Sequence, residues 1–76
     1  MKKIKITIKN FYTKNIIRTY EKETDLNTYK ELLNNLNIYL QEVIIYNEKK
    51  KKLISENNVI ENEDQIVLFN TDGQIN

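Results

Sequence analysis

The chain contains no cysteine and no histidine among its 76 residues. Without cysteine it can form no disulfide and offers no thiolate nucleophile. Without histidine it lacks both the commonest general base and the usual nitrogen ligand for zinc. Most classes of enzyme depend on one of these groups. We therefore expect a protein that is not an enzyme and that binds no metal or cofactor of its own.

Neither sign of charge is in clear excess, because 12 basic side chains stand against 11 acidic ones and the net charge is +1. Such a balance creates no field that would draw the protein to nucleic acid or to an anionic membrane. The first segment, MKKIKITIKN, alternates lysine with isoleucine where a signal peptide or a membrane span needs an unbroken apolar run. We expect a cytoplasmic protein with protein partners, and no binding to nucleic acid or membrane.

The length allows one domain with a small core, since a chain of this size buries only roughly 60% of the surface that its unfolded form exposes. From Lys3 to Lys9, isoleucine alternates with lysine or threonine, which predicts a strand with one buried face. The following NFYTKN has asparagine at both ends, as suits a turn, and IIRTYEK then resumes a β-branched and aromatic pattern. These segments together predict a β-hairpin.

In DLNTYKELLNNLNI, the spacing of apolar residues changes from every second residue to the spacing of a helix. Apolar residues spaced at i, i+3, i+4 and i+7 form one stripe: Tyr29, Leu32, Leu33 and Leu36. Thr28 and Glu31 form a capping box, in which each side chain is expected to satisfy the free backbone amide of the other residue. The helix is predicted to begin at Thr28 and to end near Asn37, because asparagine tolerates the left-handed conformation that closes helices.

The second half of the chain predicts three more strands. EVIIYNEK is apolar on both faces, which is typical of a central strand, and LIS returns as a short strand after a turn. ENNVIENED is expected to be an irregular connection in which Val59 and Ile60 tuck under the sheet. QIVLFN then forms the last strand.

This order of elements favours a two-layer α+β domain, because the strands can bury their apolar faces only if the helix packs across one side of the sheet. The simplest solution is the β-grasp, or ubiquitin-like, arrangement. It has a mixed sheet of four or five strands, with the first and last strands parallel at its centre. We expect residues 1–70 to form this single domain and residues 71–76 to form a flexible C-terminal tail.

Three segments of the chain resemble the bacterial ubiquitin-like sulfur carriers of the ThiS and MoaD type. They are TYKELLNNL (Thr28 to Leu36), VIIYNEK (Val43 to Lys49) and NEDQIVLF (Asn62 to Phe69). The resemblance implies a carrier for thiamine or molybdopterin biosynthesis. A partner activating enzyme would use ATP to adenylate the terminal carboxylate of the carrier, and sulfur would then replace one oxygen. The carrier itself supplies no catalytic residue.

The tail, NTDGQIN, departs from the terminal Gly-Gly of those carriers, because Gly73 is the only glycine in the chain. Trimming after Gly73 would expose it as the carboxyl donor, which is the first hypothesis. The alternative is a noncatalytic β-grasp module that binds a protein partner through the open face of its sheet. The structural interpretation is that Gly73 is an ordinary turn glycine in a polar terminus.

Adjacent residues of a strand point to opposite faces, so burial of Ile66 and Leu68 beneath the helix would bring Val67 and Phe69 to the open face. An alternating set from the strand between Val43 and Tyr46 would lie beside them, and from it we select Ile45. An exposed apolar patch of this kind favours partner binding. Loops or a second copy of the chain could also cover it, and we expect a monomer or a weak homodimer.

Two charged clusters are less informative. The four lysines from Lys49 to Lys52 could contact phosphate, but such a run in a hairpin connection is more often simply solvated. Glu61, Glu63 and Asp64 could suggest a cation, yet their spacing matches no calcium loop. We predict neither a nucleic-acid site nor a metal site at these positions.

Overall fold

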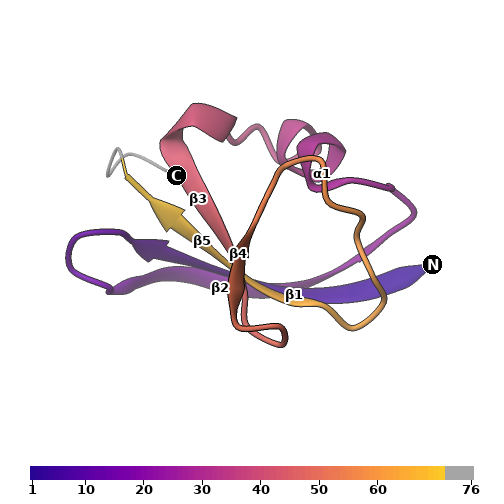
Figure 1. The fold of residues 1–76 in the computed structure, drawn as a ribbon, viewed down its shortest axis with the longest axis horizontal. Helices are drawn as coiled ribbons and strands as arrows, with labels where there is room; N and C mark the ends of the chain where they lie inside the picture. The colour runs from indigo at the N-terminus through magenta and orange to yellow at the C-terminus, as the bar shows by residue number, and fades with distance from the viewer. Residues whose placement is uncertain (72–76) are drawn as a thin grey trace.

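A computed structural model describes residues 1–71, apart from the side chain of Leu40. Five strands, one α-helix and a 3₁₀ turn follow one another along the chain (Figure 1). They are β1 (Lys2–Asn10), β2 (Ile16–Thr24), α1 (Tyr29–Asn35), η1 (Leu40–Glu42), β3 (Val43–Asn47), β4 (Lys52–Ile54) and β5 (Gln65–Asn70). The sequence predicted each of these elements except η1. No helix within residues 1–71 is long and apolar enough to cross a membrane.

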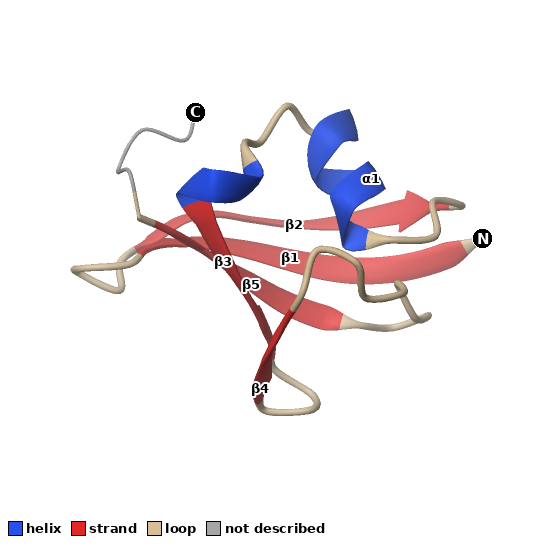
Figure 2. Cartoon of the chain, turned by 45° about the horizontal axis from the view of Figure 1, so that its top comes forward, coloured by secondary structure: helices blue, strands red, loops and turns tan. Residues whose placement is uncertain are grey.

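The strands form one mixed sheet in the order β2-β1-β5-β3-β4. β1 runs antiparallel to β2 and parallel to β5, while β3 runs antiparallel to both β5 and β4. Figure 2 shows α1 and η1 on the same side of this sheet. The first and last strands therefore lie side by side at its centre, which confirms the predicted two-layer β-grasp arrangement with five strands.

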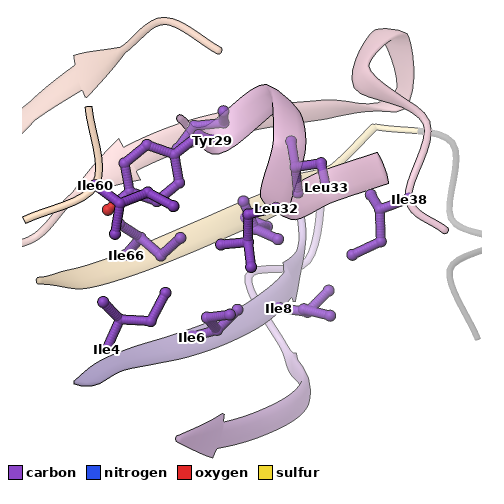
Figure 3. Packing of buried hydrophobic residues seen from close by; sticks show 11 residues of the cluster. Ile4, Ile6, Ile8, Tyr29, Leu32, Leu33, Ile38, Ile60 and Ile66 are labelled. Atoms are coloured by element: carbon purple, nitrogen blue, oxygen red, sulfur yellow. The ribbon is translucent and has the colours of Figure 1, made fainter. Parts of the chain in front are cut away.

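The core lies between α1 and the sheet (Figure 3). Isoleucines at alternate positions of β1 point toward Leu32 and Leu33 of the helix, and all of them are at most 1% exposed. The buried cluster comprises Ile4, Ile6, Ile8, Tyr29, Leu32, Leu33, Ile38, Ile45, Ile60, Ile66 and Leu68. The predicted helical stripe and strand alternation thus meet in one aliphatic layer that Tyr29 borders.

Both ends of the short helix carry the residues that the sequence predicted. The hydroxyl of Thr28 accepts a hydrogen bond from the Glu31 amide at 3.4 Å. The reciprocal half of the capping box differs from the prediction, because the Glu31 carboxylate accepts from the Thr28 hydroxyl at 3.1 Å. Asn37 has φ 60° and so takes the left-handed position that ends the helical segment.

The connection between β4 and β5 corrects one prediction. Ile60 is buried under the helix at 1% exposure, but Val59 is 62% exposed. A β-bridge joins Val59 to Thr28, and the Ile60 amide donates to the Asn27 carbonyl at 2.7 Å. The extended backbone there directs neighbouring side chains to opposite sides, so only one of the pair can enter the core.

Candidate functional site: the open face of the sheet

The side of the sheet away from α1, called the open face here, is assembled by the strand register. Residues directly opposite one another on paired strands share a face. Thr7 of β1 lies opposite Val67 of β5, and Val67 lies opposite Tyr46 of β3. In the next row, Lys9 lies opposite Phe69, which lies opposite Ile44. The centre of the open face is therefore built from β1, β5 and β3.

The centre of this face is buried although none of the helices in residues 1–71 covers it. Val67 is 2% exposed and Thr7 is 6% exposed, whereas the surrounding Lys9, Tyr46 and Phe69 are only partly buried. Larger side chains around these two small ones therefore screen them from water. The prediction that Val67 contributes to an exposed apolar patch is wrong in this respect, because its neighbours form the outer surface instead.

Four aromatic rings lie on or beside this face, and we call Phe11, Tyr12, Tyr46 and Phe69 the aromatic cluster. Phe69 contacts Phe11 and Tyr46, with ring centroids 6.4 Å apart in both cases. Tyr12 contacts Phe11 edge-to-face at 5.3 Å. Edge-to-face pairs at such distances add about 0.5–1.5 kcal/mol beyond the burial of area. The predicted Phe69 thus lies at the middle of a larger group.

The β1–β2 connection fixes two of these rings. The Phe11 amide donates to the Asn70 carbonyl at 2.9 Å, which ties the start of the loop to the end of β5. The side-chain oxygen of Asn10 accepts from the amides of Tyr12 and Thr13 at 2.9 and 3.0 Å. The loop is therefore ordered by its own hydrogen bonds and holds Phe11 against Phe69, while Tyr12 remains 73% exposed.

A cation accompanies the aromatic cluster. The Lys14 ammonium lies 4.3 Å from the centroid of Phe11 and 5.4 Å from that of Phe69, within the range of cation–π attraction. It also donates to the Phe11 carbonyl. Lys14 itself has φ 64°, an uncommon conformation for a residue with a Cβ, and this turns its side chain back over the rings. The aromatic cluster is thus positively charged at its rim.

The structure places the predicted Ile45 elsewhere. Ile45 is 5% exposed and belongs to the core beneath α1, so it is not available on the open face. Its neighbours Ile44 and Tyr46 occupy the open face, opposite Phe69 and Val67. All of these positions are apolar or aromatic, so the sequence pattern could not show which alternate residues of β3 face the helix. The pairing register of β3 with β5 determines that Ile44 and Tyr46 lie on the open face.

The candidate carboxyl donor, Gly73, lies outside the described residues, as does nearly all of the predicted tail. Its first residue, Thr71, is described. The Thr71 amide donates to the Glu42 carbonyl at 2.9 Å, and its hydroxyl donates to the same carbonyl at 3.1 Å. The chain therefore leaves β5 at a point held against η1.

The lysines between β3 and β4 form no separate basic face. Lys50 pairs with Glu61 at 3.4 Å, and the amide of Lys50 donates to the Asn47 side chain at 2.9 Å. A shallow pocket of about 270 Å³ lies nearby, lined by Lys3, Ile4, Lys5, Glu21, Lys49, Glu63, Asp64 and Gln65. Its basic and acidic residues are equal in number. Nothing in this lining selects for phosphate.

The acidic turn before β5 has a structural role at Asp64. The Tyr29 hydroxyl donates to the Asp64 carboxylate at 2.5 Å, and the Glu61 amide donates to the same oxygen at 3.0 Å. Burial, followed by this hydrogen bond, raises the pKa of Tyr29 above its ordinary value of 10.0. Within residues 1–71, no cluster of acidic side chains is arranged to hold a metal ion. Asp64 instead joins the helix to the start of β5.

The open face thus presents three partly buried rings, the ammonium group of Lys14 and the 73% exposed ring of Tyr12. Tyr12 and Lys14 were not predicted as site residues, because a loop position gives no periodic signal. The Asn residues at both ends of the loop were the only available hint that it is ordered.

Neither a protein-family model nor a curated protein matches this chain in sequence.

Proposed function

We propose that the protein is a noncatalytic β-grasp module that binds a protein partner through the aromatic cluster on its open face. The observation that supports this most directly is the exposure of Tyr12 beside rings that Phe69 anchors. Aromatic residues are enriched at the centres of protein interfaces, where an apolar ring can be desolvated at a small cost in conformational entropy. The rigid loop and sheet hold these rings in place before binding.

Lys9 and Lys14 add a recognition element to this surface. Within the described residues, neither has a carboxylate within the 4.0 Å of a salt bridge. Lys9 is partly buried and lies opposite Phe69, and a lysine in such a position can pack its aliphatic stem on apolar surface while its charged end remains in water. A partner that contacts the rings would meet these cations at the rim, where charge affects mainly the rate of association and its dependence on salt.

The test compares two tyrosines of similar exposure on opposite sides of the molecule. Tyr12 is 73% exposed on the open face, and Tyr39 is 66% exposed just before η1 in the helix layer. Immobilised wild type, Tyr12→Asp and Tyr39→Asp are each offered a soluble extract of the host cell, and the retained proteins are identified by mass spectrometry. We expect at least one protein that wild type and Tyr39→Asp retain but Tyr12→Asp loses. Identical retention by all three would refute the proposal.

A sulfur carrier that acts through its C-terminus is the second candidate, favoured by the position of β5. That strand is central in the sheet, and Thr71 is held at η1, so the following residues begin from a fixed point beside a stable scaffold. Such a geometry suits presentation of a terminal carboxylate to an activating enzyme. Gly73 would become the donor after trimming.

Intact mass distinguishes this candidate from the module. Full-length protein and a chain ending at Gly73 are incubated with an activating enzyme of the sulfur-carrier type, ATP and a sulfur donor. A carrier gains the mass of an adenylate or exchanges one carboxylate oxygen for sulfur. A module is unchanged in mass, and its binding through Tyr12 persists when residues 72–76 are deleted.

A further inference from the structure

The two edges of the sheet differ in length and exposure. β4, at one edge, spans only Lys52–Ile54, whereas β2, at the other, spans Ile16–Thr24. Short edge strands resist pairing with other chains, while long ones present a row of free backbone groups. Among residues 1–71, no strand lies on the outer side of β2, as Figure 2 also shows. The β2 edge is thus the longer unpaired surface of the sheet.

The backbone groups that point outward from β2 follow from the pairing of β1. The Lys5 amide donates to the Asp64 carbonyl, so odd-numbered residues of β1 direct their backbone groups toward β5 and even-numbered ones toward β2. Ile6 lies opposite Tyr20 in the β1–β2 register. Even-numbered residues of β2 are therefore bonded to β1, and odd-numbered ones such as Thr19 and Glu21 face outward.

Neither a proline nor a bulge in its middle protects this edge from another strand. The chain has no proline, and the single register shift lies between Ile8 and Lys9, close to the start of β2. Near that shift, Ile16 is 62% exposed and Ile17 is 43% exposed. Charged side chains begin with Arg18 and continue further along the strand, so their arrangement decides which strand could pair here.

We infer that the β2 edge binds a second copy of this chain, with two β2 strands antiparallel about a two-fold axis and Thr19 opposite its own counterpart. A two-fold axis perpendicular to the sheet places residues of the same face opposite one another, so the axis must pass through a residue position. This condition leaves one candidate register for each residue of the strand. The charges of β2 then select among these registers.

Most of these candidate registers place like charges opposite one another. Registers centred on Arg18, Glu21, Lys22 or Glu23 place that charge opposite itself, and a register centred on Tyr20 places Arg18 opposite Lys22. Like charges directly opposite one another are destabilising in a sheet. Centring on Thr19 places Ile17 opposite Glu21 and Arg18 opposite Tyr20, with no like pair. Centring on Ile17 also avoids like pairs, but it pairs only residues 16–18 of the strand.

The pairing centred on Thr19 covers residues 17–21 and stops where the register shift distorts the start of β2. It joins the two sheets into one, with both helices on the same side and both open faces on the other. An interface formed mainly by one short strand pair is small, so we expect a weak dimer whose population depends on concentration. The aromatic cluster is not used in this contact.

Single cysteines test the register, because the chain has none of its own. Opposed residues of an antiparallel pair lie within the Cα separation that a disulfide requires. Under mild oxidation, Thr19→Cys should form a linked dimer about tenfold faster than Glu23→Cys, whose position on the same edge lies outside the paired segment. A mixture of Ile17→Cys and Glu21→Cys should yield mainly the mixed dimer. Equal rates for Thr19→Cys and Glu23→Cys would overturn the inference.

Sedimentation equilibrium provides a second measurement without cross-linking. We expect the wild type to show a concentration-dependent dimer and Thr19→Pro to lose it, because the Thr19 amide points away from β1 and proline removes only the outward donor. Thr19→Val retains that donor and should still form dimers. A monomeric wild type at every concentration, or a folded Thr19→Pro that still forms dimers, would refute the proposed contact. Neither result bears on partner binding through Tyr12.

Discussion

The two faces of the sheet bury their central residues by different means. On the covered face, Leu68 lies beneath α1 with an exposure of 0%, surrounded by aliphatic side chains. On the open face, the adjacent Val67 reaches 2% exposure between Thr7 of β1 and Tyr46 of β3, which lie opposite it in the sheet. Residues 1–71 contain one α-helix, and that helix can cover only one side of the sheet. The difference shows that side chains of the sheet itself can bury a residue that no second layer of secondary structure covers.

The means of burial determine what a partner can reach. Displacing α1 would expose the whole aliphatic core, whereas rotating one ring of the aromatic cluster uncovers only a small apolar area. Exposed side chains change rotamer on a much faster timescale than helices move. The open face therefore combines a buried centre with side chains that a partner can reach, whereas the core of the covered face lies beneath α1.

The sharpest test of this contrast substitutes the two adjacent residues of β5. Leu68→Ala should lower the free energy of unfolding by about 2–5 kcal/mol, because the helix cannot collapse fully into the cavity. Val67→Ala should cost only about 1–2 kcal/mol, since it removes fewer carbon atoms and the surrounding side chains can close over the gap. Urea denaturation of both variants measures the difference. Equal losses would show that the two faces are packed equally tightly.

A smaller effect is expected at the polar margin of the covered face. Tyr29→Phe removes the donor to the buried Asp64 carboxylate and should cost about 1–3 kcal/mol at neutral pH. The raised pKa of Tyr29 means that the folded protein keeps a proton that the unfolded chain releases above pH 10.0. The stabilisation is therefore complete below pH 10.0 and decreases as the pH rises further.

Unfolding measured across this alkaline range distinguishes the effect of Tyr29 from general repulsion between charges. The wild type should lose stability above pH 10.0 more steeply than Tyr29→Phe does, so the two curves should converge there. Tyr12→Phe serves as the control, because Tyr12 is exposed and its hydroxyl donates to no carboxylate of residues 1–71. Parallel curves for wild type and Tyr29→Phe would contradict the assigned role of the hydrogen bond.

The smallest effect is expected from the cation on the open face. Lys14→Gln removes the ammonium over Phe11 and Phe69 and should cost about 0.5–1 kcal/mol. Lys30→Gln changes an exposed lysine of α1 that has no ring beneath it, and it should be nearly neutral. Thermal unfolding of both variants at matched salt gives the comparison. If Lys14→Gln lowered the free energy of unfolding as much as Leu68→Ala does, the distinction between the two faces would be wrong.

The fold could be predicted because its signals are local and agree with one another. Alternation over Lys3 to Lys9, the helical stripe and the cap at Thr28 each specified an element, and few two-layer arrangements fit their order. The parallel pairing of β1 and β5 was predicted as part of the β-grasp arrangement, and the apolar character of both strands suited their central placement. Only η1, a short turn without its own pattern, was missed among the elements.

The site was harder to predict because it depends on register and on a loop. In VIIYN every residue before the asparagine is apolar or aromatic, so periodicity could not tell whether Ile45 or its neighbours face the helix. Similarly, alternation assigns Val67 to the open face, but its 2% exposure there arises among side chains of other strands, such as Thr7 and Tyr46, which lie opposite it. Contacts of this kind arise from tertiary packing and leave no trace in a local pattern.

The position of β5 has a practical consequence for dividing the molecule. The β1–β2 hairpin and the β3–β4 hairpin are joined in the sheet only through this strand. A chain that lacks β5 would have two half-sheets without a common neighbour, and a synthetic peptide of residues 61–71 could insert between them. The protein is thus suited to fragment complementation, in which regained fluorescence or binding reports that the two pieces have met.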